Sequence, residues 1–299
     1  MIQFLFPVYL SCIFGIPFVA SLLPVLSVDQ TFWKAILLFT FPVVFSVCFV
    51  VIAGLLSKPA QRAIVAGKFP RDLKNPLYAL RRLYGLCWTS VFYFTPLYYV
   101  MLSVPVLKKT LFRTFGYKGS LNFTVYADTW IRDLPLLHLE EGAYLANKAT
   151  MGTNMCLGDG SILIDSIHVG KNGLIGHLAM IAPGSQIHEK AEIGVGTAFG
   201  IRAVAKENCK ISPTVSINHG AVLGKDCDIG FMSYVGVKAV IKDGIRLPPA
   251  SNIPSGAVIN TQEDVDNHMS SENASLLELR EKMKGNLKKS YASNIPKAS

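Results

Sequence analysis

Residues 169–199 read VGKNGLIGHLAMIAPGSQIHEKAEIGVGTAF, and every sixth position from Val169 to Phe199 carries a large apolar side chain. The same spacing extends in both directions, from Leu139 to Ile259, without an interruption in the count. A repeat of this length indicates a solenoid in which each unit stacks on the next. Twenty-one positions follow the rule: Leu139, Leu145, Met151, Leu157, Leu163, Val169, Ile175, Ile181, Ile187, Ile193, Phe199, Ala205, Ile211, Ile217, Leu223, Ile229, Val235, Ile241, Leu247, Ile253 and Ile259.

Two further positions of the six-residue unit are also restricted. The position after the apolar residue is often glycine, as at Gly176 and Gly194, and the fourth position after it is small, as at Ala179 and Cys209. Six residues suffice for one short strand and one corner, so three units close a triangular coil with the aliphatic inside. We expect the glycine to permit a tight turn with positive φ. Seven coils stacked about 4.8 Å apart give a parallel β-helix roughly 34 Å long.

The composition points to a membrane. Of the 299 residues, 51% are hydrophobic and 16% are charged, whereas a soluble domain carries about 25% charged residues. The uncharged stretches 2–28 and 35–56 are each long enough to cross a bilayer, which predicts a transmembrane helical hairpin over residues 1–57. Residues 58–118 carry eleven basic side chains against one acidic side chain, Asp72.

This basic excess predicts which side of the membrane the β-helix occupies and which kind of partner the basic segment contacts. By the positive-inside rule it places residues 58 onward, including the β-helix, on the cytoplasmic side of the inner membrane. A juxtamembrane cluster of this kind favours an anionic lipid leaflet, not nucleic acid, as its partner. Residues 86–107 form a third uncharged run, but Pro96 would break a helix there and leave two halves too short to span. We therefore expect an in-plane or re-entrant element in preference to a third span.

The remaining boundaries follow from composition. Residues 58–116 form a basic juxtamembrane and interfacial segment, and 117–260 hold the β-helix after an irregular lead-in over 117–138. Residues 261–299 form C-terminal helices and a tail, because Thr261 and Asp264 resemble a capping box and apolar residues follow it: Val265, Met269, Leu276, Leu277, Leu279 and Met283. Cys209 and Cys227 are eighteen residues apart, so they should stack in adjacent coils as buried, reduced thiols.

These patterns resemble known families. The repeat resembles the LpxA-like hexapeptide superfamily, and this resemblance supplies the left-handed sense of the helix and its common homotrimeric assembly. The segments LYALRRLYGL (77–86), LKKTLFRTFGYKG (107–119), DTWIRDLPLLHLEEGAYLA (128–146) and GHLAMIAPGS (176–185) resemble the membrane-bound terminal domain of non-ribosomal peptide synthetases and of ε-poly-lysine synthetase. The resemblance implies acyl transfer from a thioester donor, acyl-CoA or a carrier protein, to an amine or hydroxyl of a small-molecule acceptor. The acyl group could be acetyl or aminoacyl.

The candidate catalytic residue is His219. The stretch VSINHGAVLGKDCDIG (215–230) is similar to one in sugar N-acetyltransferases of this superfamily, which implies that His219 is the general base. Asn218 could donate a hydrogen bond, and Asp226 or Asp228 could orient the ring. His177 and His219 both lie two residues after an inward aliphatic, so both are expected to point outward from a flat face. In a trimer, His177 would reach the same cleft from a neighbouring subunit, whereas His168 and His188 lie nearer the corners.

Two other functions stay open. Residues 235–266 are similar to the closing stretch of γ-class carbonic anhydrases, but His177 is followed five residues later by Ala182, so the expected pair of zinc histidines is absent from the sequence and we expect no metal. The third possibility is a non-catalytic, trimeric, membrane-associated scaffold or docking domain, since fold alone does not decide function.

Overall fold

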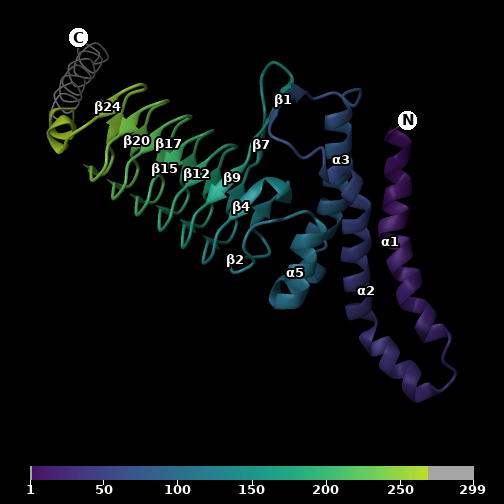
Figure 1. The fold of residues 1–299 in the computed structure, drawn as a ribbon. Helices are drawn as coiled ribbons and strands as arrows, with labels where there is room; N and C mark the ends of the chain where they lie inside the picture. Colours follow the sequence, from purple (N-terminus) through teal and green to yellow (C-terminus); the bar gives the residue numbers. More distant parts are fainter. Residues whose placement is uncertain (1, 269–299) are drawn as a thin grey trace, which may run out of the picture.

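The chain forms a group of helices followed by a long column of short strands. The computed structural model describes residues 2–268. Figure 1 shows the two longest helices side by side at one end of the molecule and the column leading away from them. The helices and the first strand are α1 (Ile2–Leu26), α2 (Thr31–Gln61), β1 (Gly67–Pro70), α3 (Pro76–Phe92), α4 (Thr95–Ser103) and α5 (Pro105–Thr114).

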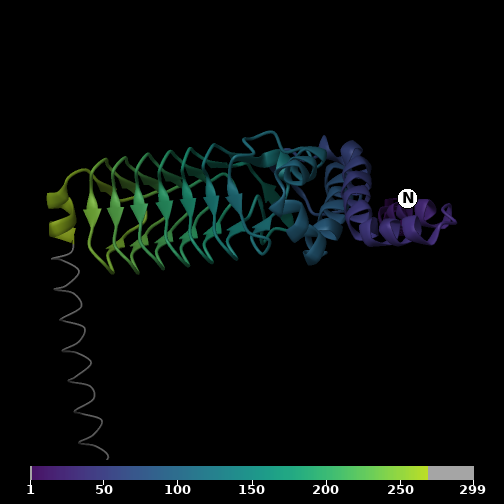
Figure 2. The ribbon, with the colours of Figure 1, turned by 90° about the horizontal axis from the view of Figure 1, so that it is seen from below.

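The column is a parallel β-solenoid with three faces, each a parallel sheet of seven strands, and Figure 2 shows these strands in successive, evenly stacked turns. The first face contains β2 (Thr124–Val125), β5 (Tyr144–Leu145), β10 (Leu174–Ile175), β13 (Glu192–Ile193), β16 (Lys210–Ile211), β19 (Asp228–Ile229) and β22 (Arg246–Leu247). The second face contains β3 (Trp130–Ile131), β6 (Thr150–Met151), β11 (Met180–Ile181), β14 (Ala198–Phe199), β17 (Ser216–Ile217), β20 (Tyr234–Val235) and β23 (Asn252–Ile253). The third face contains β4 (Leu137–Leu139), β9 (Ile167–Val169), β12 (Gln186–Ile187), β15 (Val204–Ala205), β18 (Val222–Leu223), β21 (Val240–Ile241) and β24 (Val258–Ile259).

The apolar register is confirmed for nineteen of the twenty-one positions. The last residue of each strand in these sheets points inward, and side chains such as Ile175, Ile193 and Ile229 have no exposed surface. The small positions are also buried, including Ala179, Cys209 and the polar Ser185 and Thr197. Burial raises the pKa of both stacked thiols, Cys209 and Cys227, as expected for unreactive cysteines. The left-handed sense of the column stays a prediction.

The prediction was wrong for Leu157 and Leu163. They belong to a hairpin, β7 (Asn154–Cys156) and β8 (Ser161–Ile164), that leaves the column and pairs antiparallel with β1. Leu139 pairs with Val169, thirty residues on, whereas Ile175 pairs with Ile193, eighteen residues on. The difference, 30 − 18 = 12, is two whole repeat units. An insertion of that length leaves the count in sixes unchanged, so the sequence pattern could not reveal it.

The lead-in over 117–138 is more regular than expected. It contains β2, β3 and the start of β4, which are the first strands of the three sheets. Val125 pairs in register with Leu145, and Ile131 pairs with Met151. The first turn of the column therefore begins at β2 and ends with Leu139 in β4, and the inward residues of β2 and β3 replace the two positions lost to the hairpin.

The glycines after the inward aliphatics have a different role from the predicted one. A Cβ atom at Gly194 would lie 2.4 Å from the backbone of Ser212 in the next turn, so this glycine is needed for close stacking of backbones. Positive φ occurs two residues later, at Gly196 (65°) and also at residues with side chains, such as Asn172 (55°) and Leu178 (59°). The positive φ at the corners therefore does not require glycine, whereas the close contact between the backbones of neighbouring turns does.

The N-terminal helices fit the expected apolar hairpin in length. By length and composition, residues Leu5–Leu26 of α1 and Thr31–Gln61 of α2 are long and apolar enough to cross a membrane. The uncharged run 86–107 is divided between the end of α3, α4 and the start of α5. Neither candidate span includes that run. At the other end of the chain, Thr261 Oγ1 accepts from the Asp264 amide at 3.2 Å, and Asp264 Oδ2 accepts from the Thr261 amide at 3.0 Å.

This capping box begins a short C-terminal helix, in which Val265 is fully buried. The remaining apolar positions expected there, Met269, Leu276, Leu277, Leu279 and Met283, lie outside the described residues.

Buried polar groups join α3 to the first turn of the column. Arg81 forms an ion pair with Asp133, whose side chain is fully buried. Thr153 Oγ1 donates to Asp133 Oδ2 at 2.8 Å. Trp88 Nε1 donates to the Ile131 carbonyl at 2.8 Å, and Tyr84 accepts from a backbone amide of the same segment. We call these side chains the junction.

Candidate functional site

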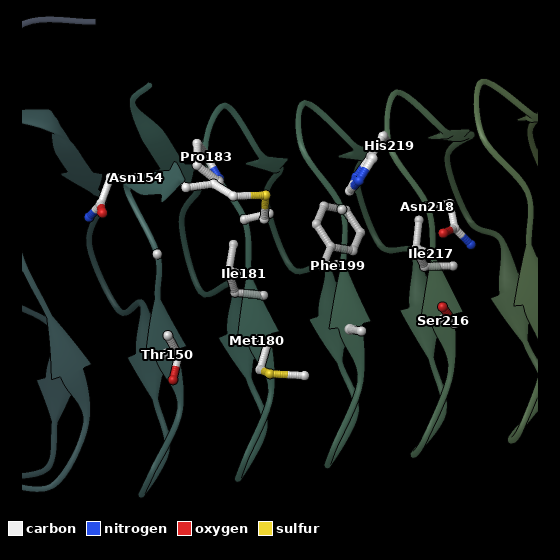
Figure 3. Close-up of a pocket in the computed structure, with 15 residues that line it drawn as sticks. Thr150, Asn154, Met180, Ile181, Pro183, Phe199, Ser216, Ile217, Asn218 and His219 are labelled. Carbon is white, nitrogen blue, oxygen red and sulfur yellow. The ribbon is translucent and has the colours of Figure 1, made fainter. Parts of the chain in front are cut away.

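The candidate site is an apolar groove along the second face of the column. It has a volume of about 340 Å³ and runs across β6, β11, β14 and β17. Met180, Ala198 and Ser216 line it from the strands, and Asn218 and His219 line it from the turn that follows β17. Figure 3 shows Asn154 toward one end of the groove and Asn218 toward the other. The mostly apolar walls suit an apolar chain or ring, with the hydroxyls of Thr150 and Ser216 on the strands and Asn218 and His219 at the rim.

His219 lies in a turn at a corner of the column, not on a flat face as predicted. The strand ends at Ile217, and the chain turns at His219 and Gly220 before Ala221 begins the next side. The prediction failed because each strand is only two residues long, so the second residue after the aliphatic is already in the corner. The His219 side chain is exposed and borders the groove.

Backbone groups hold the two rim residues. The Ile201 amide donates to His219 Nδ1 at 3.0 Å, and Asn218 Nδ2 donates to the Val235 carbonyl at 3.0 Å. The amide that orients the imidazole therefore replaces the predicted carboxylate. Asp226 instead accepts from Asn208 at 3.0 Å, and Asp228 lies on the first face, in β19.

The hydrogen bond from the Ile201 amide determines which ring nitrogen of a neutral His219 carries the proton. Because Nδ1 accepts a hydrogen bond, the ring proton must be on Nε2. The free nitrogen of the ring is thus a hydrogen-bond donor in the observed arrangement. A general base would need an unprotonated nitrogen within reach of the acceptor, so this role requires the ring to release the Ile201 amide.

The close packing of the turns also holds this residue in place. A Cβ atom at Gly200 would lie 2.6 Å from the Asn218 backbone and 2.9 Å from His219 Nδ1. Gly200 is one of the repeat glycines, so the rule that allows the turns to stack also makes room for the imidazole.

The other predicted histidines lie elsewhere. His177 is half-buried in the turn after β10, at the corner between the first and second faces, and it does not line the groove. His219 is at the corner between the second and third faces, two turns along, so the structure does not bring the pair together within one chain. His168 lies 3.1 Å from Glu140 and stacks on His138, and His188 lies 3.5 Å from Glu207.

Sequence reasoning missed the contribution of the hairpin. Asn154 and Met155 line the groove from β7, although their positions in the six-residue count suggested ordinary column residues. The only available signal was the sequence LGDG at 157–160, a turn-forming cluster in the middle of the repeat. Among residues 2–268, we find no group of three or more His, Cys, Asp or Glu side chains placed to hold a metal ion.

No protein-family model matches the chain, and no curated protein matches it. Several solved structures do. A variant of perosamine N-acetyltransferase from Caulobacter crescentus, in complex with CoA and GDP-perosamine, is 13% identical with a TM-score of 0.24; the match covers 51% of this chain and 58% of that one. A hexapeptide transferase family protein from Anaplasma phagocytophilum is 16% identical over 48% of this chain and 91% of that one, with a TM-score of 0.19. Serine acetyltransferase from Neisseria gonorrhoeae, in complex with serine, is 15% identical with a TM-score of 0.18 over 74% and 73%. This chain is thus similar to hexapeptide-repeat transferases at low identity and low overall superposition.

Proposed function

We propose that this protein is a membrane-anchored acyltransferase of the hexapeptide-repeat type, with its reaction in the groove beside His219. The observation that carries the proposal is the position of an oriented imidazole at the rim of an apolar groove of about 340 Å³. Acyl transfer from a thioester needs space for the acyl group and a donor for the carbonyl oxygen as it becomes negative. The groove and the Nε2–H group of His219 are suited to these two tasks.

The reaction is written with an amine acceptor. The amine nitrogen attacks the thioester carbonyl carbon, and the electron pair of the C=O bond moves to oxygen, where Nε2–H of His219 donates a hydrogen bond. The C–S bond then breaks, and the proton lost from nitrogen ends on the released sulfur. An amine fits this arrangement better than a hydroxyl, because a neutral amine is nucleophilic without a base. The donor is acyl-CoA or a carrier-protein thioester, and no metal takes part.

The arrangement of the whole molecule forms part of the same proposal. Helices α1 and α2 anchor the chain in the inner membrane as a transmembrane hairpin (residues 1–57), with the column (117–260) in the cytoplasm and the basic segment 58–116 against anionic lipid. The column is left-handed and assembles as a homotrimer, in which His177 of a neighbouring subunit approaches the groove.

The test distinguishes a hydrogen-bond donor role of His219 from a general-base role. Purified full-length protein is assayed with acetyl-CoA and a panel of amines, and thiol release is followed. His219→Ala should lower kcat/KM at least about a hundredfold, the usual loss for one oxyanion donor. His219→Gln retains an N–H donor but cannot act as a base, so a donor role predicts partial activity. If both variants are equally inactive, His219 is the base originally predicted. If both are fully active, the groove is not an acyl-transfer site.

A specific observation favours a second function, a docking scaffold. Exposed apolar side chains follow the corner between the first and second faces: Leu178, Val195, Phe231 and Met232. Pro213 and Thr214 separate them into two groups along the corner, and exposed apolar patches commonly mark interaction sites. Under this alternative, Phe231→Ser with Met232→Ser would abolish assembly or partner binding, while His219→Ala would have no effect in cells.

A further inference from the structure

A second cavity, separate from the groove, lies between α3 and the β7–β8 hairpin. Its volume is about 470 Å³. Four arginines line it, together with four other side chains: Arg71, Arg81, Arg82 and Arg132, with Tyr78, Asn154, Cys156 and Ile162. No carboxylate is among the lining residues. The cavity is open to solvent, with Arg71 and Arg82 exposed at its edge and Arg81 buried; four guanidinium groups around one opening are unusual for a surface that serves only solubility.

The charge of this cluster is largely uncompensated. Asp133 forms an ion pair with Arg81 and lies 3.9 Å from Arg132, so one carboxylate faces two guanidinium groups. Arg71 donates to the Cys156 sulfur at 3.2 Å, and the Arg82 guanidinium lies 5.7 Å from the centre of the Phe6 ring. Neither contact supplies a full negative charge. Four positive charges against one negative charge leave +3 at the cavity.

Two members of the cluster, buried Arg81 and partly buried Arg132, have unused hydrogen-bond donors. The Arg81 side chain is only 4% exposed, and the Nε atoms of Arg81 and Arg132 are buried without a hydrogen-bond partner. Burial is the main cause that lowers the pKa of Arg132, and the nearby Arg81 charge lowers it further, against an opposing effect of Asp133. Arg81 and Arg132 share the single carboxylate of Asp133, and a buried donor without a hydrogen bond is costly, so an anion bound at the cavity would supply negative charge that Asp133 alone does not.

The backbone of α3 is shaped to receive one of these groups. A Cβ atom at Gly85 would lie 2.6 Å from Arg132 Nη2, so the guanidinium rests directly on the helix backbone. Glycine within a helix costs about 1 kcal/mol relative to alanine. Gly85 therefore gives up helix stability at the one place where Arg132 needs the space.

We propose that this cavity binds a phosphate or pyrophosphate group through Arg71, Arg82 and Arg132. Guanidinium groups present paired N–H donors that match phosphate oxygens, often in bidentate pairs. Asn154 lines both this cavity and the apolar groove, so a ligand held here by its phosphate can extend toward the groove. The phosphate belongs either to a soluble compound or to a lipid headgroup, since Arg82 also contacts the apolar helix α1 through Phe6.

Binding is measured on the full chain in detergent by calorimetry, with three probes: sodium pyrophosphate, dioctanoyl phosphatidic acid and dioctanoyl phosphatidylcholine. Arg71→Gln and Arg82→Gln change exposed side chains outside the buried ion pair, and Gly85→Ala displaces Arg132. Each should weaken binding about tenfold or more, the usual effect of losing a charge-assisted contact. The control is Arg246→Gln, an exposed arginine on β22 far along the column, which should change nothing.

The outcomes distinguish a soluble phosphate compound from a lipid headgroup, and they distinguish phosphate binding at this cavity from acyl transfer at the groove. Tight binding of pyrophosphate identifies a soluble phosphate compound, and binding of phosphatidic acid without pyrophosphate identifies a lipid. Bound ligand should also slow the labelling of Cys156 by a charged thiol reagent, because this exposed cysteine lies beside Arg71. The proposal is overturned if neither pyrophosphate nor phosphatidic acid binds. It is also overturned if the three variants bind these two probes as Arg246→Gln does. His219→Ala should bind both probes normally, so failure of acyl transfer would not affect this result.

Discussion

The column is stabilised by many equivalent apolar contacts, whereas the junction is stabilised by a few buried polar contacts, each of a different kind. In the column, the same apolar core position and the same small corner position recur on three faces, so each turn is supported by neighbours built from equivalent parts. In the junction, single buried polar contacts join α3 to the first turn, above all the ion pair between Arg81 and Asp133. A repeat distributes its stability over many similar interfaces, whereas a buried polar contact has no substitute when one partner is removed.

The strongest test of this difference is a charge in the column core. Ile193 is fully buried in β13 between β10 and β16, so Ile193→Asp places a carboxylate where no partner exists. We expect the free energy of unfolding to fall by at least about 4 kcal/mol, measured by thermal melting of the strand signal in circular dichroism.

The adjacent residue is the control for this variant. Glu192 is exposed on the same strand, so Glu192→Gln should stay within about 0.5 kcal/mol of the parent. If Ile193→Asp melts like the parent, the column core is not packed as described.

The second test removes a charge from the junction. Asp133→Asn keeps an amide oxygen that can accept from Thr153, and asparagine tolerates the left-handed conformation observed there (φ 53°). It leaves Arg81 buried without a counter-charge, which should cost about 3–5 kcal/mol.

The loss should be local. Hydrogen exchange should accelerate in α3 and in β2–β4, while amides from β13 to β24 keep their protection. Equal acceleration along the whole column would show that the two regions unfold together and are not stabilised independently.

The third test separates the two kinds of glycine within the column. Gly194→Ala should cost about 2 kcal/mol, because its Cβ would overlap the backbone of the next turn. Gly244→Asn should change stability by less than about 0.5 kcal/mol. Gly244 has a φ of 73° with open space around its Cβ position, and asparagine already occupies equivalent corners at 172 and 208. Thermal melts of the two variants give the comparison directly; equal losses would mean that corner conformation, and not backbone contact, requires glycine.

The smallest expected effect is a pH dependence in the hairpin that links the two regions. Lys68 and Asp159 form an exposed ion pair at 2.6 Å between β1 and the β7–β8 turn. Lys68 is the main cause that lowers the pKa of Asp159, and hydrogen bonds from Ser161 add to it.

Because the folded pKa is depressed, this pairing contributes fully above the unfolded value of about 3.9 and is lost as pH falls through the lower folded value. Exchange of β1 and β8 amides should therefore increase below about pH 4 in the parent, and Asp159→Asn should remove that step. A step of unchanged size in the variant would assign it to another group.

The sequence by itself determined the column. Its period of six is a local property: an inward residue such as Ile193, a small residue four positions on and a glycine where backbones meet depend only on neighbouring turns. The capping box at Thr261 and the stacked, reduced thiols Cys209 and Cys227 are local in the same sense. The apolar lengths of α1 and α2 could likewise be read from composition.

Only the tertiary structure decided where the repeat is interrupted and what gathers there. The hairpin inserts twelve residues, a multiple of the period, so periodicity cannot detect it. Its pairing joins Gly67 to Ile164 across α3, α4, α5 and the first strands of the column. The groove, the amide that orients His219 and the arginine cavity all depend on such distant contacts. Each side chain in them is compatible with a solvated surface until the fold brings its partners together. For that physical reason, the column could be predicted from one sequence, whereas of the candidate sites the sequence indicated Asn218 and His219 but neither the groove they border nor the arginine cavity.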